Sequence, residues 1–245
     1  MRPILLLLAS LPLAACMNTR TTTPEPASAD AFTSPRVSTH REGDDLLTGG
    51  LGRDALLNPV APAVADADHP TAAELRRRAL YANWRGIADL YGSVKDIPSV
   101  PGREYHAYAR LPGANQPHRV LAQIPDAFDA KQRCLIVTAS SGSRGVYGAI
   151  GSVSLYGLPH GCAVAHTDKG TGTGFVDIAS GEGAQADGTR AARGADLEFD
   201  PGTQAATDET RIAIKHAHSG DNPEADWGRH VLQAARSVIS PFDSL

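Results

Sequence analysis

The sequence lacks several features that would each indicate a particular class of protein. It has no basic excess, because 27 Asp and Glu residues outnumber 23 Lys and Arg residues and the net charge is −4. Nucleic-acid-binding proteins usually present a basic face, so we expect no nucleic-acid partner. No glycine-rich loop ends in the Gly-Lys-Ser/Thr of a Walker motif, which argues against a site for nucleotide phosphates.

A hydrophobic run long enough to span a bilayer is also missing, and what stands in its place is an export signal. Arg2 precedes an apolar run at residues 4–13, which is shorter than the roughly 20 residues that a spanning helix needs. A Leu-Ala-Ala-Cys motif ending at Cys16 looks like a bacterial lipobox, so we expect Cys16 to be acylated and to begin the mature chain. The alternative is an ordinary signal peptide cleaved near residues 14–15. Both interpretations predict export, to the outer membrane as a lipoprotein, to the periplasm or to the extracellular space.

Composition divides the rest of the chain into two parts. Residues 17–43 are rich in Thr, Pro, Ser and Ala, so they bury little apolar surface, and we expect a flexible tether after the signal segment at residues 1–16. Residues 44–245 are numerous enough for one domain with a sizeable core.

The first half of this domain has three clear local patterns. Pro70-Thr71-x-x-Glu74 resembles a capping box before a helix that we expect to reach about residue 90. Alternating segments at 103–111 and 118–125 flank a Pro-Gly-Ala-Asn-Gln-Pro loop, which predicts an antiparallel hairpin.

Two short apolar runs follow, at about 134–139 and 162–167, and a segment of helix length at 147–158 lies between them. Each run ends abruptly in small and polar residues. This pattern predicts a βαβ unit in a parallel sheet, with chemistry on the loops after the strands.

The C-terminal part predicts a long polar loop, one more strand and a helix. The loop covers about 176–209, the strand 210–218, and the helix about 226–239. The apolar residues that we expect on one face of this helix are Trp227, Val231, Leu232, Ala235 and Val238.

The whole order predicts an α/β fold, namely the front part of an α/β-hydrolase-like sheet with an antiparallel start and then parallel strands with crossover helices. In such folds a further strand leads to the nucleophile. We therefore expect residues 44–245 to form a partial domain and the chain to be truncated.

The loop after the first parallel strand carries the main candidate site residues, Ser141, Gly142, Ser143 and Arg144. A nucleophile elbow requires Gly-x-Ser-x-Gly, and Ser141 occupies the first glycine position, so Ser143 is a weak candidate nucleophile. We favour a loop whose backbone N–H groups face an oxyanion or a substrate carboxylate, with Arg144 binding the carboxylate. A structural turn is the third interpretation.

Two other polar groups are less specific. Asp168 follows the second parallel strand, and we expect it to shape a pocket, because the acid and histidine of such hydrolases follow the serine in sequence. His216 and His218 face the same side of a strand, with Asp221 nearby, but no third ligand has diagnostic spacing. We therefore expect no metal and no cofactor.

Cys134 and Cys162 each open a predicted strand. An oxidising compartment permits a disulfide, but small buried thiols are the interpretation that we favour. The sequence does not give the separation of their Cα atoms, so it does not decide whether a disulfide forms.

Three segments resemble the D-(-)-3-hydroxybutyrate oligomer hydrolases. They are ASSGSRGVYGAIG at 139–151, GCAVAHTDKGTGTG at 161–174 and HAHSGDNPEADWGRHVLQA at 216–234. Members of this family are exported bacterial esterases that finish the degradation of poly(3-hydroxybutyrate), and they are far longer than this chain. The resemblance implies an esterase that hydrolyses 3-hydroxybutyrate oligomers to monomers.

The family's nucleophilic serine belongs to a Ser-Val-Ser-Asn-Gly-Gly segment, and this segment is absent here. The resemblance therefore implies an N-terminal fragment that is inactive alone, with its nucleophile beyond the chain. The alternative is a non-catalytic outer-membrane lipoprotein that acts as a binding module. A small esterase that uses Ser143 is the interpretation that we favour least.

Overall fold

A computed structural model of the 245-residue chain describes residues 32–85, 96–141, 144–172, 174–202, 211–215 and 220–239. The expected signal segment at residues 1–16, including Cys16, lies outside the described residues. No helix in the described ranges is long and apolar enough to cross a membrane.

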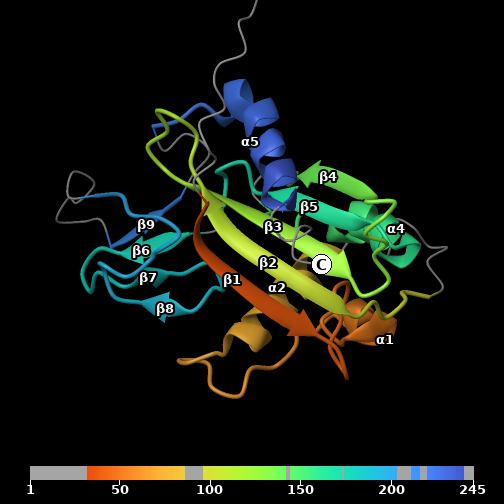
Figure 1. The fold of residues 1–245 in the computed structure, drawn as a ribbon. Helices are drawn as coiled ribbons and strands as arrows, with labels where there is room; N and C mark the ends of the chain where they lie inside the picture. Colours follow the sequence, from red (N-terminus) through yellow and green to blue (C-terminus); the bar gives the residue numbers. More distant parts are fainter. Residues whose placement is uncertain are drawn as a thin grey trace, which may run out of the picture.

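The fold is α/β, and its centre is a five-stranded mixed sheet (Figure 1). The strand order is β1-β2-β3-β5-β4, with β1 at Phe32–His40, β2 at Gly102–Ala109, β3 at His118–Pro125, β4 at Leu135–Ala139 and β5 at Ala163–Thr167. β1, β2, β3 and β5 pair antiparallel in that order, whereas β4 and β5 are parallel. The predicted hairpin and the predicted parallel pair are therefore both confirmed.

Strand β1 corrects the expected extent of the tether. Composition predicts a flexible segment at 17–43, but residues 32–40 pair with β2 from Phe32 opposite Ala109 to His40 opposite Gly102. β1 is an edge strand whose side chains are mostly exposed or half-buried. Its order comes from backbone pairing with β2, and composition does not report such pairing.

The helical segments lie between and after the strands. They are α1 at Gly52–Leu57, α2 at Ala72–Trp84, a π-helical turn η1 at Ile150–Ser154, α4 at Leu155–Gly157, a 3-10 turn η2 at Leu158–His160 and α5 at Pro223–Ser237. The capping box of α2 is confirmed, because the Thr71 hydroxyl accepts from the N–H of Glu74 and the Glu74 carboxylate accepts from the N–H of Thr71.

The segment predicted as a helix at 147–158 is helical but irregular. Turns at 146–149 lead into η1, α4 and η2. At Gly157 a side chain would meet Ile136 at 2.8 Å and Val164 at 3.0 Å, so glycine lets this segment pack directly on β4 and β5. Close packing therefore takes precedence over regular helical geometry here.

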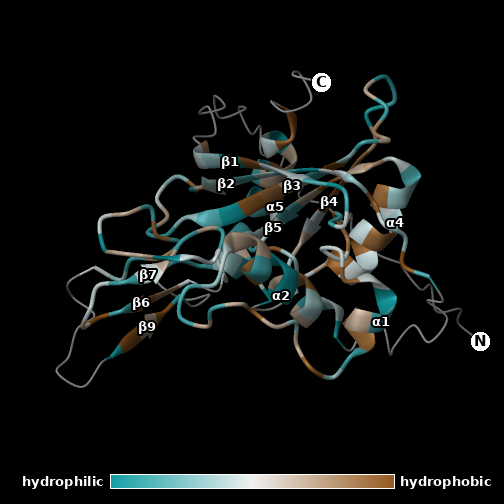
Figure 2. Cartoon of the chain, turned by 90° about the horizontal axis from the view of Figure 1, so that it is seen from below, coloured by the Kyte–Doolittle hydropathy of each residue, from teal (hydrophilic) through white to brown (hydrophobic). Residues whose placement is uncertain are grey.

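Helix α5 covers one face of β3, β5 and β4, and α1, α2 and η1 lie on the other side (Figures 1 and 2). Beneath α5 the sheet presents small residues such as Ala122 and Ala165, which pack with Ala234 and Val238. On the opposite face Leu121 packs with the cluster that includes Leu80 and Trp84 of α2. The alternation of Leu121 and Ala122 along β3 thus separates two cores.

The expected buried face of the last helix is wrong in part. Trp227 and Leu232 are exposed, and the helix buries His230 and Gln233 instead, together with Ala234 and Val238. Gln233 Oε1 lies 2.7 Å from Nε2 of the buried His118. Two polar side chains therefore occupy the packed face, one hydrogen-bonded to the buried His118 and the other, His230, edge-on to its ring, and a hydrophobic pattern does not detect them.

A small second sheet follows β5, with the order β8-β7-β6-β9 (Figure 1). Its strands are β6 at Phe175–Asp177, β7 at Gly183–Ala184, β8 at Arg190–Ala191 and β9 at Ile212–Ile214. The expected long loop at 176–209 thus contains short strands. The expected strand at 210–218 is shorter than predicted, and residues 216–218 lie outside the described residues.

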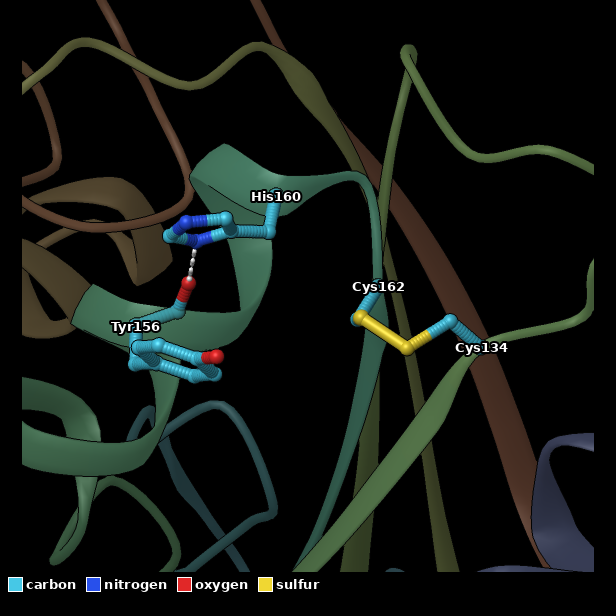
Figure 3. The surroundings of a disulfide bond; sticks show 4 residues. All are labelled: Cys134, Tyr156, His160 and Cys162. Atoms are coloured by element: carbon cyan, nitrogen blue, oxygen red, sulfur yellow. Dashed lines mark hydrogen bonds between the residues drawn. A yellow bond between two sulfur atoms is a disulfide. The ribbon is translucent and has the colours of Figure 1, made fainter.

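The two cysteines of the domain form a disulfide, which corrects the preference for free thiols (Figure 3). Cys134 directly precedes β4 and Cys162 directly precedes β5, and their Cα atoms are 4.7 Å apart. The parallel register that pairs Leu135 with Ala163 brings the two cysteines side by side. Tertiary pairing therefore supplies the geometry that sequence left open.

Candidate functional site

A cavity of about 620 Å³ lies between β1, α2 and the sheet face that carries His106 and Arg119. The loop after β4, at residues 144–147, and the segment 186–188 complete its wall. Sites for small molecules are typically about 300–1,000 Å³, so this cavity has the size of such a site. Its apolar lining comes largely from small side chains, namely Ala72, Ala73, Ala79, Ala82, Val146 and Ala186.

The floor of the cavity rests on Glu104 of β2, whose side chain is fully buried. Both oxygens of its carboxylate are hydrogen-bonded. Arg76 donates from Nε and Nη2 at 2.9 Å, Tyr147 Oη donates at 2.7 Å, and Gln123 Nε2 donates at 2.9 Å. Burial alone would raise the pKa of Glu104, but Arg76 and the hydrogen bonds from His106 and Arg76 hold it well below its ordinary value. The carboxylate is therefore ionised.

Arg76 joins this carboxylate to the segment after β1. Its Nη1 donates to Asp44 at 3.0 Å and its Nη2 donates to the carbonyl of Asp45 at 3.0 Å. His40 links the same groups, with Nδ1 2.7 Å from Asp44 and Nε2 3.4 Å from Glu104. Burial opposes charge on His40, yet these two carboxylates raise its pKa above the ordinary value. Glu104 and its partners therefore form one buried network, which we call the Glu104 network.

His106 is one of the members of this network that line the cavity. Its side chain is 16% exposed, and its Nε2 lies 3.2 Å from Glu104 Oε2. Burial lowers the pKa of His106, so the ring is neutral near pH 7. An ionised carboxylate only accepts hydrogen bonds, so Nε2 carries the proton and Nδ1 is an acceptor.

Among the described residues, four arginines line the cavity: Arg36, Arg76, Arg119 and Arg144. The first three each lie beside a carboxylate, that of Asp187, Glu104 and Glu198 respectively. Arg144 instead donates from Nη2 to the carbonyls of Ala82 and Asn83, both at 3.3 Å. Within the described ranges no carboxylate pairs with Arg144, so its charge is available to an anionic ligand.

The structure brings one of the four predicted loop residues to this cavity. Arg144 lines it, together with Gly145 and Tyr147. Ser141 is exposed and is not part of the lining, and Gly142 and Ser143 lie outside the described residues. Arg144 is therefore positioned where it could contact a carboxylate in the cavity, whereas the role of the neighbouring backbone N–H groups stays a prediction.

Asp168 is fully buried and is not among the residues that line this cavity. Its Oδ1 accepts from the backbone N–H groups of Arg119 at 3.0 Å and Gly170 at 2.8 Å. Burial would raise its pKa, but the Lys215 ammonium, 3.9 Å away, and other charges lower it. Asp168 thus holds the turn after β5 against the backbone of Arg119, and pocket shaping stays a prediction.

The structure describes only part of the group of His216, His218 and Asp221 that the sequence analysis considered as metal ligands. His216 and His218 lie outside the described residues, and Asp221 accepts hydrogen bonds from the backbone N–H groups of Asn115 and Gln116. Among the side chains that the structure describes, no group of three or more His, Cys, Asp and Glu could hold a metal ion.

Sequence reasoning missed Glu104 and His106. Both belong to the predicted strand at 103–111, and residues two apart on a strand face the same side. A Glu and a His on the face opposite to Tyr105 and Ala107 were a detectable signal. From residue type alone, however, a Glu and a His predict a solvent-exposed face. The structure shows instead that α2 and residues 144–147 cover this face.

The buried His166 predicts an acid-sensitive fold. Its Nε2 lies 3.1 Å from Ser154 Oγ and from Gln123 Oε1, and burial lowers its pKa from 6.5 to about 4. Below pH 6.5 the unfolded chain binds a proton there that the folded chain does not, so stability falls as the pH falls from 6.5 to about 4. Urea unfolding over this range should show a shallower decline for His166→Gln than for the wild type, and parallel declines would contradict the assignment.

Comparison with known proteins places the chain in a family. The family model described as 3HB-oligomer hydrolase (3HBOH) matches residues 13–240. The chain is 45% identical over 224 residues to the D-(-)-3-hydroxybutyrate oligomer hydrolase of Cupriavidus metallidurans, covering 80% of this chain and 31% of that protein. It is 44% identical over 248 residues to a protein of the same name from Ralstonia pickettii, covering 89% of this chain and 34% of that protein.

A third similar protein, from Paraburkholderia xenovorans, has the same name and is 42% identical over 218 residues, which cover 78% of this chain and 31% of that protein. The chain thus spans about a third of the length of the curated relatives that it matches. No solved structure matches significantly.

Proposed function

Because the chain belongs to the 3HB-oligomer hydrolase family, we propose that it is the front part of an exported esterase that hydrolyses 3-hydroxybutyrate oligomers. We place the binding of these oligomers in the cavity beside the Glu104 network. The observation that carries this placement is Arg144, a cation that lines the cavity and has only backbone carbonyls as partners among the described residues.

The chemistry of the ligand agrees with the lining. A linear oligoester of 3-hydroxybutyrate has a carboxylate at one end and a methyl group on every unit. Arg144 suits the carboxylate, because a guanidinium forms charge-assisted hydrogen bonds to both of its oxygens. The alanines of α2 and Val146 offer apolar contact to the methyl groups.

An α/β-hydrolase-like sheet is part of the same proposal. Its support is the strand order, in which an antiparallel hairpin leads to β5 and the parallel β4 follows at the edge. Among the described strands β4 has a partner on one side only. A further parallel strand on that edge would complete the pattern in which a strand leads to the nucleophile.

The first test is binding by the purified protein. Isothermal titration with linear 3-hydroxybutyrate trimer should detect binding, and Arg144→Ala should weaken it about tenfold, because a charge-assisted hydrogen bond is lost at a partly exposed site. Arg211→Ala is the control, since Arg211 is exposed and lies outside the cavity lining. Equal affinity of the Arg144→Ala variant and the wild type would reject this placement of the ligand.

The second test concerns catalysis. We propose that these 245 residues do not hydrolyse the trimer alone, because the sequence contains no Ser-Val-Ser-Asn-Gly-Gly segment. Chromatography of the reaction mixture should therefore show no release of monomer above the buffer control. Hydrolysis that disappears in Ser143→Ala would contradict the proposal and would place the nucleophile in the loop after β4.

Export and lipid attachment are proposed from the N-terminal sequence. If Cys16 is acylated, a bacterial host fed with labelled palmitate should label the wild-type protein and the control Thr22→Ser, and the membrane fraction should contain both. Cys16→Ser should lose the label and leave the membrane fraction. An unlabelled wild-type protein in the periplasm would instead support an ordinary signal peptide.

A further inference from the structure

The cavity offers two recognition groups with opposite hydrogen-bonding capacity. Arg144 only donates, whereas His106 presents a nitrogen that accepts. Resting on the proposed function, we propose that Nδ1 of His106 accepts a hydrogen bond from the free hydroxyl at one end of a linear 3-hydroxyacyl oligomer, while Arg144 binds the carboxylate at the other end. The cavity then recognises both ends of the same ligand.

The tautomer of His106 follows from its contacts. Nε2 faces the ionised carboxylate of Glu104 at 3.2 Å, so that nitrogen carries the proton. Burial, and then the charges of Arg119 on β3 and Arg76 on α2, lower the pKa of the ring against the opposing effect of Glu104, so the imidazole is neutral and is left with one acceptor, Nδ1. In the described part of the chain Nδ1 has no hydrogen-bond partner, and the ring borders the cavity.

The Glu104 network also holds the ring in place. Glu104 is anchored by two hydrogen bonds from Arg76 and by one from Tyr147, whose ring meets the His106 ring edge-on with centroids 6.4 Å apart. A side chain that is fixed before binding loses little entropy when it accepts a ligand, which favours affinity and selectivity. His106 is therefore a binding residue that requires no movement to receive a hydroxyl.

The ligand has a single group that this acceptor can recognise. In a linear oligoester of a hydroxy acid every ester oxygen accepts hydrogen bonds, the carboxylate accepts them too, and only the terminal hydroxyl donates. The two carboxylates that line the cavity, of Asp44 and Asp187, are each paired with an arginine. His106 is thus an acceptor, held in place by the Glu104 network, that would distinguish the hydroxyl end from the rest of the ligand.

The test uses three ligands: the linear 3-hydroxybutyrate trimer, its analogue with hydrogen in place of the terminal hydroxyl, and its carboxyl methyl ester. Removing the hydroxyl adds no bulk, so a loss of affinity reports the hydrogen bond. By titration calorimetry the wild type should bind the trimer about five- to tenfold more tightly than the deoxy analogue, as expected for one buried hydrogen bond.

His106→Gln is the informative variant, because the glutamine amide still donates to Glu104 but offers no acceptor at the place of Nδ1. It should bind the trimer and the deoxy analogue equally, while it keeps the preference for the carboxylate over the methyl ester. Arg144→Ala should bind the trimer and its methyl ester equally, while it keeps the preference for the trimer over the deoxy analogue. His160→Gln is the matched control, because His160 is exposed, stacks on Tyr156 and lies outside the cavity lining (Figure 3).

The outcomes separate the two proposals. A wild-type protein that binds the trimer and the deoxy analogue equally, yet prefers the carboxylate to the methyl ester, overturns the assignment of His106 and leaves the proposed function intact. A protein that binds none of the three ligands overturns both. If His106→Gln fails to fold, the comparison of the two ligands on the wild type still decides.

Discussion

Replacing Glu104 by alanine is expected to lower the free energy of unfolding by about 3–5 kcal/mol, which would be a large fraction of the stability of a domain this size. The physical reason is that Arg76, the partner of Glu104, remains buried after the substitution. Arg76 is largely buried, with a side-chain exposure of 11%, and two of its nitrogens donate to Glu104. Without the carboxylate this guanidinium stays buried with only the weaker compensation of Asp44 and the Asp45 carbonyl.

Urea unfolding followed by circular dichroism at pH 7 measures this loss, and Glu182→Ala is the matched control, since the Glu182 side chain is exposed. A double variant, Glu104→Ala with Arg76→Met, should recover part of the loss, because it removes the uncompensated charge. A loss below about 1 kcal/mol for Glu104→Ala, similar to a surface substitution, would mean that the Glu104 network contributes little to the fold.

Removal of the disulfide is expected to cost about 3–4 kcal/mol. Cys134 and Cys162 are 28 residues apart, and a crosslink that closes a loop of this length lowers the entropy of the unfolded chain by roughly that amount in the chain-entropy account. The bridge also joins the starts of β4 and β5, the parallel pair that carries the loop with Arg144 (Figure 3). Its loss should therefore loosen the wall of the cavity as well as the sheet.

The measurement compares unfolding with and without dithiothreitol. The wild type should lose stability in the reductant, and the Cys134→Ala, Cys162→Ala double variant should have the lower stability in both conditions. A wild type that is equally stable with its disulfide reduced would contradict the expected contribution. Formation of this bridge requires an oxidising compartment, so its contribution to stability is consistent with the proposed export.

The elements that sequence predicts well are those with local physical causes. The capping box at Thr71 and Glu74 is confirmed, because both of its hydrogen bonds join residues three apart. The hairpin of β2 and β3 is confirmed, since alternation and a turn specify it. The parallel pair of β4 and β5 is confirmed within one residue at each start, because a continuous apolar run is typical of a buried strand.

The predictions from sequence are wrong where the structure of a segment depends on a partner that is distant in the chain. β1 has the composition of a tether, and its order depends on β2, more than 60 residues later in the chain for every pair in its register. The packed face of α5 includes Gln233 because His118, separated by 115 positions, needs a hydrogen-bond partner. Neither requirement leaves a periodic signal in the segment itself.

The residues of the candidate site also fall into those that the sequence predicts and those that it does not. The loop after β4 and the suitability of Arg144 for a carboxylate could be inferred from residue types, because loops after parallel strands carry function and guanidinium groups bind carboxylates. Glu104 and His106 could not, since charged residues are seldom fully buried unless they are paired, and the pairing partners lie on other elements. The role of Asp168 as an acceptor for backbone N–H groups also depends on β3.

By itself, the sequence determined the local elements of this protein and its membership of the 3HB-oligomer hydrolase family, because capping, alternation and motif identity are properties of neighbouring residues. The tertiary structure alone decided that Cys134 and Cys162 are joined, that residues 32–40 form a strand, and that a cavity exists above the Glu104 network. These features depend on which residues meet across the sheet. Strand register determines that, and register is settled only when the whole core packs.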